Sequence, residues 1–478
     1  MASVPKLLLL VLCSYHALFA NAGGDRSYKV VSIDSLKSGS VCPESEALIV
    51  SVTSQSTGVS TDGPCSMPSL DEILRQDQLR AAYIQRKFSV GDQQLRAAAY
   101  TQRKFSGGDA AKAGGAGGVL KLLESDAMVP VMLGSSLEYA ITVGIGSPAV
   151  NQTMLIDTGS DVPWVQCKPC SQCHSQEEPL FDPSTSSTYS PISCSSATCT
   201  KLEQDKAGNG CSNSECQYYA KYGDGSRTSG TYSSDTLTLG STTIPNFQFG
   251  CGRAQSGMHE KSAGLMGLGG GAQSLVTQTS GTFGTAFSYC LPATSSSPGF
   301  LKLGAGTGGS GFAKTPMIRS SPIPTYYGLR LEGIRVGGKQ LEIPTSVFSS
   351  GLVVDSGAVV SRLPKTAYSA LSAAFKEGMK KYQLAPPGTS SVLDPCYDFS
   401  GSSDVELTSV ALVLSGGGVV ELSPEGILLE RKGRYYCLAL AGNSDDTSFG
   451  VIGNVAQRTI EVMYDIGGET VGFKTGAC

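Results

Sequence analysis

Short runs of alternating apolar and polar residues, broken by Gly, Pro, Ser and Asn, fill the chain from about Val129 to its end. Alternation with a period of two, bounded by such turn residues, predicts β-strands. Residues 366–382 are the one long stretch in this part with helical spacing, and they predict a helix inserted between strands. The pattern therefore predicts an all-β architecture with one inserted helix.

The strand-rich part repeats one design at long range. In each half a predicted hairpin leads to an apolar strand that ends in Asp-Thr-Gly at Asp157 or in Asp-Ser-Gly at Asp355. Each half then reaches a second element of two apolar residues and a glycine. Such self-similarity indicates two related lobes, which we place at residues 133–315 and 316–478.

The chain before these lobes has a different pattern. Residues 1–22 place a basic residue ahead of an apolar stretch and end in a small-x-small motif, which predicts a cleavable secretory signal. We interpret residues 23–132 as a propeptide. Within it, near-copies at residues 78–89 and 94–106 have the spacing of a basic amphipathic helix, which is either a solvated face or a docking element. The glycine-rich residues 107–118 predict a flexible linker that is open to proteases.

Composition and charge exclude two function classes. The formal net charge is -4, from 36 basic and 40 acidic residues, so we expect no nucleic-acid partner. Hydrophobic residues make up 40% of the chain, which is enough for a core. No interior run approaches the roughly 18 apolar residues that a membrane helix needs, so we expect no membrane span after signal removal.

The cysteine count predicts disulfide bonds. Of fifteen cysteines, three lie in the predicted signal and propeptide, which leaves an even twelve in an exported chain. The twelve are Cys167, Cys170, Cys173, Cys194, Cys199, Cys211, Cys216, Cys251, Cys290, Cys396, Cys437 and Cys478. Spacing alone does not give their connectivity. Cys170-Ser-Gln-Cys173-His174 also fits a haem-attachment or metal-binding pattern, but we expect neither a metal nor a cofactor in this chain.

The two Asp-containing motifs together predict a catalytic pair. A pseudo-twofold axis between the lobes would bring Asp157 and Asp355 together, because Gly159 and Gly357 allow close approach of the backbones. Two carboxylates that close cannot both ionise, so they would share one proton. One could then activate a water molecule while the other protonates a carbonyl oxygen. This pattern predicts general acid-base hydrolysis of an amide.

The motifs LIDTGSDVPWVQC, YGDGS, AGLMGLG, FSYCLP, VVDSGAVVSRLP, LDPCYDFSG and VIGNVAQRTIEVMYD lie between about Tyr139 and Cys478. This set resembles the plant-type, nepenthesin-like branch of the pepsin family of aspartic endopeptidases. The resemblance covers roughly 340 of 478 residues. It implies a bilobal pepsin-like fold with two pseudo-twofold-related β lobes, a substrate cleft between them and a hairpin flap.

The same resemblance assigns roles around the predicted pair. Asp157 and Asp355 match the catalytic aspartates, and Thr158 and Ser356 match the hydroxyls that brace the two catalytic loops against each other. Ser160 matches the hydroxyl that donates to the outer oxygen of the first aspartate.

In the flap, Tyr222 matches the family tyrosine, flanked by Gly223 and Gly225, and Trp164 matches its hydrogen-bond partner. Ala358 departs from the pattern, because the family usually has Thr or Ser at this position. The second aspartate should therefore lack an outer donor, and we expect activity to extend to higher pH than in relatives with the hydroxyl.

The resemblance also implies a disulfide-stapled insertion at residues 167–216 and the pairings Cys396 with Cys437 and Cys290 with Cys478. Asn151 begins a glycosylation sequon.

An acidic cleft would attract basic residues of the propeptide until acid weakens the contact. The basic residues that we expect to do this are Arg86, Lys87, Arg103 and Lys104.

The sequence thus predicts an aspartic endopeptidase that is made as a secreted zymogen and acts as a monomer on protein or peptide substrates. Its destination would be the extracellular space (apoplast) or the vacuole. A catalytically inactive pepsin-fold protein with a binding or inhibitory role is the alternative. A DNA-associated protease is disfavoured by the mildly acidic charge balance.

Overall fold

The computed structural model describes residues 27–37, 68–105, 126–134, 136–258, 261–304, 310–320 and 323–478, with the backbone only at residues 89–105. The predicted signal and the glycine-rich linker lie outside the described residues.

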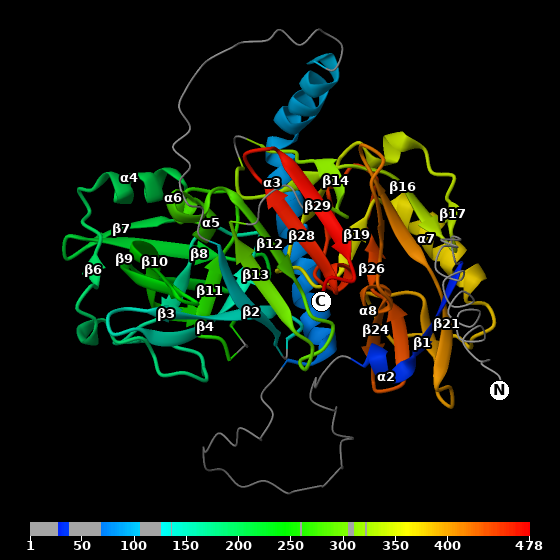
Figure 1. Cartoon of the computed structure of the whole chain (residues 1–478), viewed down its shortest axis with the longest axis horizontal. Coiled ribbons are helices and arrows are strands. Elements are labelled where there is room, and N and C mark those ends of the chain that lie inside the picture. The colour runs from blue at the N-terminus through cyan, green and yellow to red at the C-terminus, as the bar shows by residue number, and fades with distance from the viewer. Residues whose placement is uncertain are drawn as a thin grey trace, which may run out of the picture.

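The N-terminal lobe is built almost entirely of antiparallel strands (Figure 1). Its elements are β2 Ala127–Leu133, β3 Tyr139–Ile145, β4 Val150–Asp157, β5 Trp164–Gln166, η1 Pro183–Thr185, β6 Ser190–Pro191, α4 Ala197–Gln204, β7 Gly208–Ser212, β8 Glu215–Lys221, β9 Arg227–Leu239, β10 Thr242–Ser256, β11 Gly264–Gly267, α5 Leu275–Gln278, α6 Ser280–Phe283, β12 Ala286–Cys290 and β13 Gly299–Leu303. The strands alternate buried and exposed residues, as in β2, whose odd positions are buried.

The C-terminal lobe repeats this construction in smaller sheets. Its elements are β14 Ala313–Pro316, β15 Gly328–Leu329, β16 Leu331–Val336, β17 Lys339–Gln340, η2 Thr345–Phe348, β18 Leu352–Val354, β19 Ser361–Leu363, α7 Lys365–Gly378, β20 Cys396–Asp398, β21 Asp404–Thr408, β22 Val410–Leu414, β23 Val419–Glu421, α8 Pro424–Ile427, β24 Leu428–Arg431, β25 Tyr435–Leu438, β26 Leu440–Gly442, β27 Gly450–Ile452, η3 Val455–Gln457, β28 Ile460–Asp465 and β29 Thr470–Thr475. The helix α7 lies where the sequence predicts an inserted helix.

A sheet shared by the two lobes joins them. Strands β28 and β29 of the C-terminal lobe continue the sheet that contains β12, β13 and β2, in the order β14-β29-β28-β12-β13-β2-β3. One large cluster of buried side chains follows this sheet from one lobe into the other. The predicted all-β bilobal fold is confirmed.

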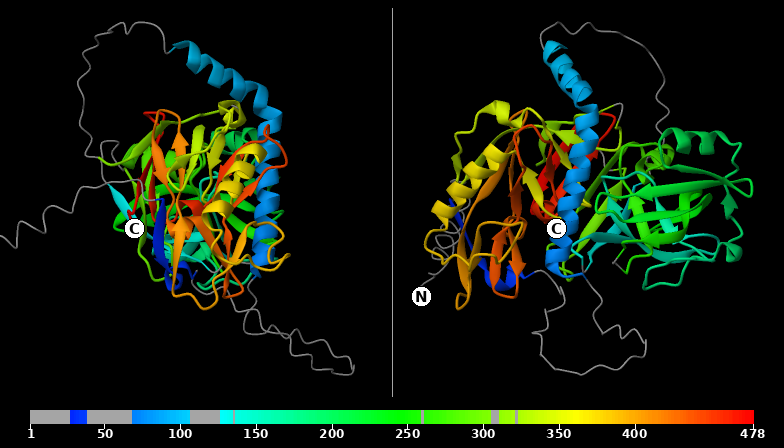
Figure 2. Two further views of the ribbon diagram at one scale, coloured as in Figure 1. Left: turned by 90° about the vertical axis from the view of Figure 1, so that its right-hand side faces the viewer. Right: turned by 180° about the vertical axis from the view of Figure 1, so that it is seen from behind.

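The segment before the lobes is anchored at two places. Strand β1 Tyr28–Ser32, followed by the short helix α2 Ile33–Leu36, pairs antiparallel with β21 at the edge of the C-terminal lobe. The helix α3 Leu70–Phe105 lies between the two lobes, in front of them in the right-hand view of Figure 2. The two near-copies found in the sequence therefore belong to one continuous helix.

Candidate active site

Each candidate aspartate lies at, or one residue beyond, the end of a strand that is held by a parallel neighbour. Asp157 is the last residue of β4, and β11 pairs with β4 in parallel up to Gly267 opposite Asp157. Asp355 follows β18, which pairs in parallel with β27. The Asp355 N–H also donates to the Ile452 carbonyl at 3.1 Å. Both carboxylates therefore start from rigid, buried backbone.

The loops after the two strands hold each other through hydroxyl groups. The Ser356 N–H donates to Thr158 Oγ1 at 3.0 Å, and the Thr158 N–H donates to Ser356 Oγ at 3.0 Å. Each hydroxyl then donates to a carbonyl of the opposite loop, Thr158 to Val354 and Ser356 to Ile156. This symmetrical network fixes the separation of the two carboxylates, because each loop satisfies the other's buried polar groups.

Glycines let the two loops meet. A Cβ on Gly159 would lie 2.9 Å from both carboxylate oxygens of Asp355, and one on Gly357 would lie 2.6 Å from Asp157 Oδ1. Any larger residue at either position would push the carboxylates apart.

The two carboxylates have different donors within their own loops. Asp157 accepts from the Gly159 N–H at 2.8 Å and from Ser160 Oγ at 2.6 Å. Asp355 accepts from the Gly357 N–H at 3.0 Å. Ala358 is buried beside it and offers no side-chain donor to its outer oxygen, Oδ2.

An arginine of α3 contacts both carboxylates. Arg80 of α3 places Nη2 at 2.6 Å from Asp157 Oδ1 and 2.9 Å from Asp355 Oδ1, and its Nε lies 3.0 Å from Asp355 Oδ2. Sequence reasoning expected other basic residues here. Arg86 and Lys87 are exposed, and the side chains of the second copy of the repeat are not described.

The charges at this cluster are strongly coupled. Burial raises the pKa of Asp355, the Arg80 charge opposes that rise, and the nearby Asp157 charge adds to it. For Arg80, burial acts to lower the pKa, but the two carboxylates hold it well above its ordinary value. The guanidinium therefore stays charged, and burial drives Asp355 toward its neutral form.

Apolar contacts fix the helix that carries Arg80. Ile84 and Phe88 pack into the C-terminal lobe, where Phe88 stacks on Phe449 with ring centroids 4.0 Å apart. At its other end Ile73 and Leu74 pack against a second cluster of that lobe. The helix therefore fills the space between the lobes over several turns.

The hairpin between β8 and β9 covers this helix. Tyr222 begins its turn, with its N–H donating to the Ser226 carbonyl, and Gly225 takes a positive φ of 97°. Trp164 Nε1 donates to the Tyr222 hydroxyl at 2.7 Å. A Cβ on Gly223 would lie 2.6 Å from Arg80 Cα, so the hairpin rests directly on α3.

Sequence reasoning missed a further carboxylate near the pair. Asp161 accepts from the Gly271 N–H at 2.8 Å and, through Oδ2, from Thr325 Oγ1 of the C-terminal lobe at 2.6 Å. It therefore links the loop that follows Asp157 to the C-terminal lobe. The sequence places Asp161 three residues after Thr158, close to the first Asp-Thr-Gly motif, and this nearness was the available sign of a role. Its hydrogen-bond partners, Gly271 and Thr325, are remote in sequence.

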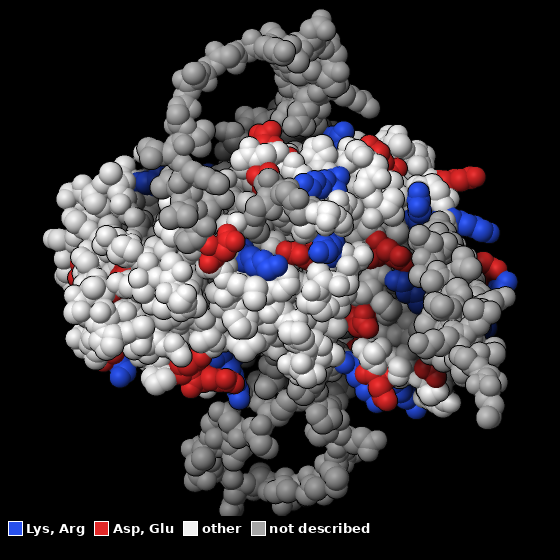
Figure 3. Space-filling model, in the orientation of Figure 1, with Lys and Arg blue, Asp and Glu red and all other residues white. Residues whose placement is uncertain are grey.

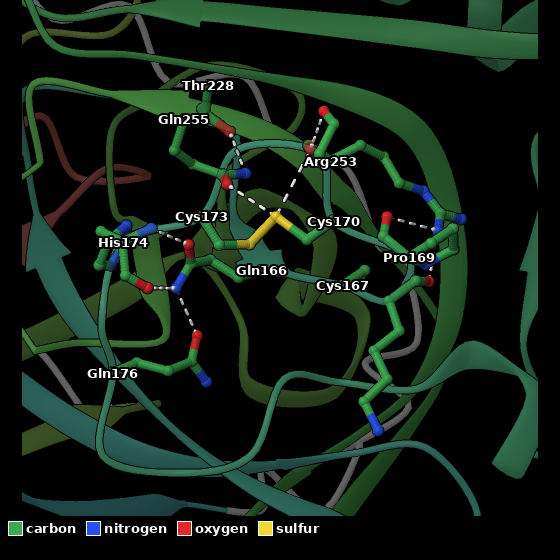
Figure 4. The surroundings of a disulfide bond; sticks show 12 residues. Gln166, Cys167, Pro169, Cys170, Cys173, His174, Gln176, Thr228, Arg253 and Gln255 are labelled. Carbon is green, nitrogen blue, oxygen red and sulfur yellow. Dashed lines mark hydrogen bonds between the residues drawn. A yellow bond between two sulfur atoms is a disulfide. The ribbon is translucent and has the colours of Figure 1, made fainter. Parts of the chain in front are cut away.

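All twelve cysteines for which the sequence predicts disulfide bonds are paired. The pairs are Cys167–Cys251, Cys170–Cys173, Cys194–Cys211, Cys199–Cys216, Cys290–Cys478 and Cys396–Cys437. The predicted insertion is thus tied to β10 through Cys251. Figure 4 shows the Cys170–Cys173 bridge beside Gln166 and His174. Because these two sulfurs are bonded to each other, they are not free thiolates for a haem or a metal.

Two surface features bear on partners. On the face shown in Figure 3, acidic and basic residues are interspersed, and the part over the N-terminal lobe carries few charges. Asn151 lies exposed in β4. Within the described part of the chain, no helix is both long and apolar enough to cross a membrane.

Each β lobe contributes one aspartate, and the two aspartate loops are related by a pseudo-twofold axis and hydrogen-bonded to each other. This arrangement defines the pepsin-like class of fold. Comparison with known proteins gives the same class. Family models described as "Xylanase inhibitor N-terminal" and "Xylanase inhibitor C-terminal" match residues 139–305 and 326–475.

Among curated proteins, Aspartyl protease AED1 of Arabidopsis thaliana is 37% identical over 99% of this chain and 98% of its own length. Aspartic proteinase nepenthesin-2 of Nepenthes gracilis is 38% identical over 73% of this chain and 80% of its own length. The crystal structure of Basic 7S globulin from soybean covers 74% of this chain and 97% of its own with a TM-score of 0.59 at 20% identity, which shows a shared fold. The chain belongs to the nepenthesin-like family of plant aspartyl proteases.

Proposed function

We propose that this protein is an aspartic endopeptidase that cleaves peptide bonds with an activated water molecule and no covalent intermediate. One observation carries the proposal. A single nitrogen, Arg80 Nη2, lies within 2.6 Å of Asp157 Oδ1 and 2.9 Å of Asp355 Oδ1. One small group can therefore contact both carboxylates at once. Without the prosegment, a water molecule at this point would lie within hydrogen-bonding distance of both.

The geometry supports separate roles for the two carboxyls. We assign the shared proton to Asp355, whose pKa burial raises. Asp157 accepts two hydrogen bonds from its own loop and acts as the base that takes a proton from the water. The water oxygen attacks the peptide carbonyl carbon while Asp355 protonates the carbonyl oxygen. Collapse of the tetrahedral intermediate breaks the C–N bond as the amine nitrogen takes up the proton held by Asp157, while a hydroxyl of the intermediate returns its proton to Asp355.

We also propose that the chain is made as a zymogen with α3 as its inhibitory segment. Arg80 covers both carboxylates, and the hairpin lies over it. We place the activating cleavage within residues 106–125, before β2, and not at residue 132. The reason is that β2 pairs with β13 on one side and β3 on the other, so cutting after residue 132 would remove a strand from the shared sheet.

Export and assembly complete the proposal. The predicted signal at residues 1–22 and six disulfides fit folding in an oxidising secretory compartment. We propose a monomer in the extracellular space or the vacuole, with protein or peptide substrates and with Asn151 as an exposed glycosylation acceptor.

The experiment is hydrolysis of an unfolded protein substrate by the processed chain between about pH 3 and pH 7, with and without pepstatin. We expect pepstatin-sensitive cleavage that Asp157→Ala and Asp355→Ala each abolish. Asp404→Ala, at an exposed position of β21 away from the carboxylate pair, is the matched control and should keep full activity. Equal activity in all three variants would refute the assigned pair.

A binding or inhibitory protein is the second candidate, and the description of the matching family models favours it. A folded, processed chain with both aspartates intact and no activity on any unfolded substrate would support that candidate instead.

A further inference from the structure

The prosegment helix buries a second functional group one turn before Arg80. Asp77 is 5% exposed, and its Oδ1 accepts from the backbone N–H of Val359 at 2.6 Å and of Val360 at 3.3 Å. Its Oδ2 lies 3.6 Å from Nη2 of Arg362. Burial raises the pKa of Asp77, and the Arg362 charge and the two N–H groups counter that rise. The carboxylate is thus held by one cation and two backbone donors of the C-terminal lobe.

The cation is itself unusual. Arg362 lies in β19 and is 7% exposed, and its Nε and Nη2 make no hydrogen bond to any described residue. Asp77 is the acidic partner of its guanidinium among the described residues. Burying a guanidinium without a full set of hydrogen-bond partners lowers the stability of the fold. Such a group therefore suggests a binding role for its N–H donors that make no hydrogen bond to a described residue. When the prosegment leaves, this cation and the two N–H groups lose their acidic partner.

A second pair in the same lobe repeats the arrangement. Arg431 is 3% exposed, and its Nη2 donates to Asp71 Oδ1 at 2.7 Å, while its Nε and Nη1 have no hydrogen-bond partner among the described residues. Asp71 and Asp77 lie six residues apart on α3, which is about 9 Å along a helix. The C-terminal lobe thus presents two buried cations to α3, each paired with an acid of that helix, although the Asp71 side chain is half exposed.

The position of Asp77 along α3 gives the distance between its binding site, formed by Arg362 and the two N–H groups, and the bond that would be cleaved at the carboxylate pair. Three residues separate Asp77 from Arg80, which corresponds to about 4.5 Å along the helix axis. An extended peptide advances about 3.3 Å per residue. A substrate side chain at the place of Asp77 would therefore belong to a residue about one or two positions from the bond at the catalytic pair.

We propose that Arg362 and the N–H groups of Val359 and Val360 form a subsite that selects an acidic side chain of the peptide substrate. Asp77 occupies this subsite in the precursor as an internal substitute for that side chain. The inference rests on the proposed endopeptidase function and adds a substrate class to it: peptides with Asp or Glu about one or two residues from the cleaved bond, on the side bound by the C-terminal lobe.

The test uses the whole chain, expressed as precursor and processed within residues 106–125. Its substrates are peptides with a central pair of apolar residues, in which a single Glu, and in a matched set a single Gln, is moved through each flanking position. At one position we expect Glu to exceed Gln by about tenfold or more in kcat/KM, the effect of one hydrogen bond to a charged group. The preference should appear mainly in KM.

Three variants test whether the preference for Glu depends on Arg362. Arg362→Met should reduce it to less than about twofold, and Arg362→Lys, which keeps the charge but not the planar fork, should retain part of it. Arg335→Met, in the outer sheet of the same lobe, is the control and should keep all of it. A wild-type enzyme that cleaves Glu and Gln peptides equally, or a preference that survives Arg362→Met, would overturn the subsite.

A binding measurement separates this inference from the proposed function. The same peptides, carrying a fluorophore, are titrated with processed Asp157→Ala protein, and anisotropy reports binding without turnover. One outcome is that no protein hydrolyses any peptide, while Glu peptides still bind more tightly than Gln peptides and this difference depends on Arg362. The protease function then fails and the subsite stands. If hydrolysis is normal and neither assay shows a preference for Glu, the subsite fails and the protease function stands. If Arg362→Met fails to fold, the Arg362→Lys protein is used in its place in the hydrolysis assay and in the binding assay.

Discussion

Replacing Arg80 by methionine should open the cleft of the precursor. Methionine keeps most of the length of the side chain but removes the guanidinium that contacts Asp157 and Asp355. The rest of the docking surface, including the Phe88 stack on Phe449, is unchanged. The variant therefore isolates the charged contact from the apolar ones.

The size of the effect follows from the burial of the contact. The Arg80 side chain is 14% exposed and its two partners 2% and 0%, so solvent screens the pair little. Removing one partner of a buried ion pair costs about 3–5 kcal/mol. We take the lower end, about 3 kcal/mol, because the carboxylate pair can bind a proton once the arginine is gone. That energy corresponds to roughly a hundredfold increase in the open fraction of the precursor.

Pepstatin binding to the unprocessed chain measures this fraction. An inhibitor that fits only the open cleft binds the precursor with an apparent Kd equal to its intrinsic Kd divided by the open fraction. The apparent Kd of the Arg80→Met precursor should therefore fall about a hundredfold relative to the wild type. Arg86→Met, an exposed arginine on the same helix, is the control and should bind as the wild type does.

One result would refute the reasoning. If processed wild-type protein binds pepstatin tightly but the Arg80→Met precursor binds it no better than the wild-type precursor, the arginine does not hold the helix in the cleft. If processed protein fails to bind pepstatin at all, the proposed function is at fault and not the docking argument.

Three further predictions concern the catalytic loops and the disulfides. Ala358→Ser adds a hydroxyl beside Asp355, whose pKa burial raises; a donor to the ionised form lowers that pKa, and because Asp355 is assigned as the protonated acid, the high-pH limb of the kcat/KM profile should move down by roughly one pH unit. An unmoved limb would count against the missing donor. Thr158→Val leaves buried backbone groups of the opposite loop without partners and should lower the free energy of unfolding by about 2–4 kcal/mol in denaturant titrations; a loss within error would contradict the bracing role. Replacing both Cys290 and Cys478 by serine removes a bridge across 188 residues and should cost up to about 5 kcal/mol on the loop-entropy model, measured the same way.

The sequence predicts best what depends on local pattern. Alternation of apolar and polar residues, together with repetition of the Asp-Thr/Ser-Gly frame, was sufficient to predict two β lobes around Asp157 and Asp355. The helix α7 was equally accessible, because its apolar spacing is regular over several turns.

Contacts between distant segments were not accessible in this way. Charge alone favoured Arg86 and Lys87, yet both are exposed while Arg80 reaches the carboxylates. The distinguishing signal is the apolar stripe that turns one face of α3 toward the lobes, with Asp77 and Arg80 on the docked side. The Cys167–Cys251 bridge likewise needs the parallel pairing of β5 with β10, which brings Cys251 opposite Val165.

The pairing of β1 with β21 has a consequence for how activation would end. Five residue pairs join this strand to the edge of the C-terminal lobe, so the chain before the lobes is attached both there and, through α3, between the lobes. Cleavage within residues 106–125 would leave both attachments intact but would convert an intramolecular contact into a complex between two separate chains. The local concentration that the covalent link maintains would then be lost, and release would become a matter of dilution. The active fraction reached after cleavage should therefore fall as the protein concentration rises, and dilution should restore it.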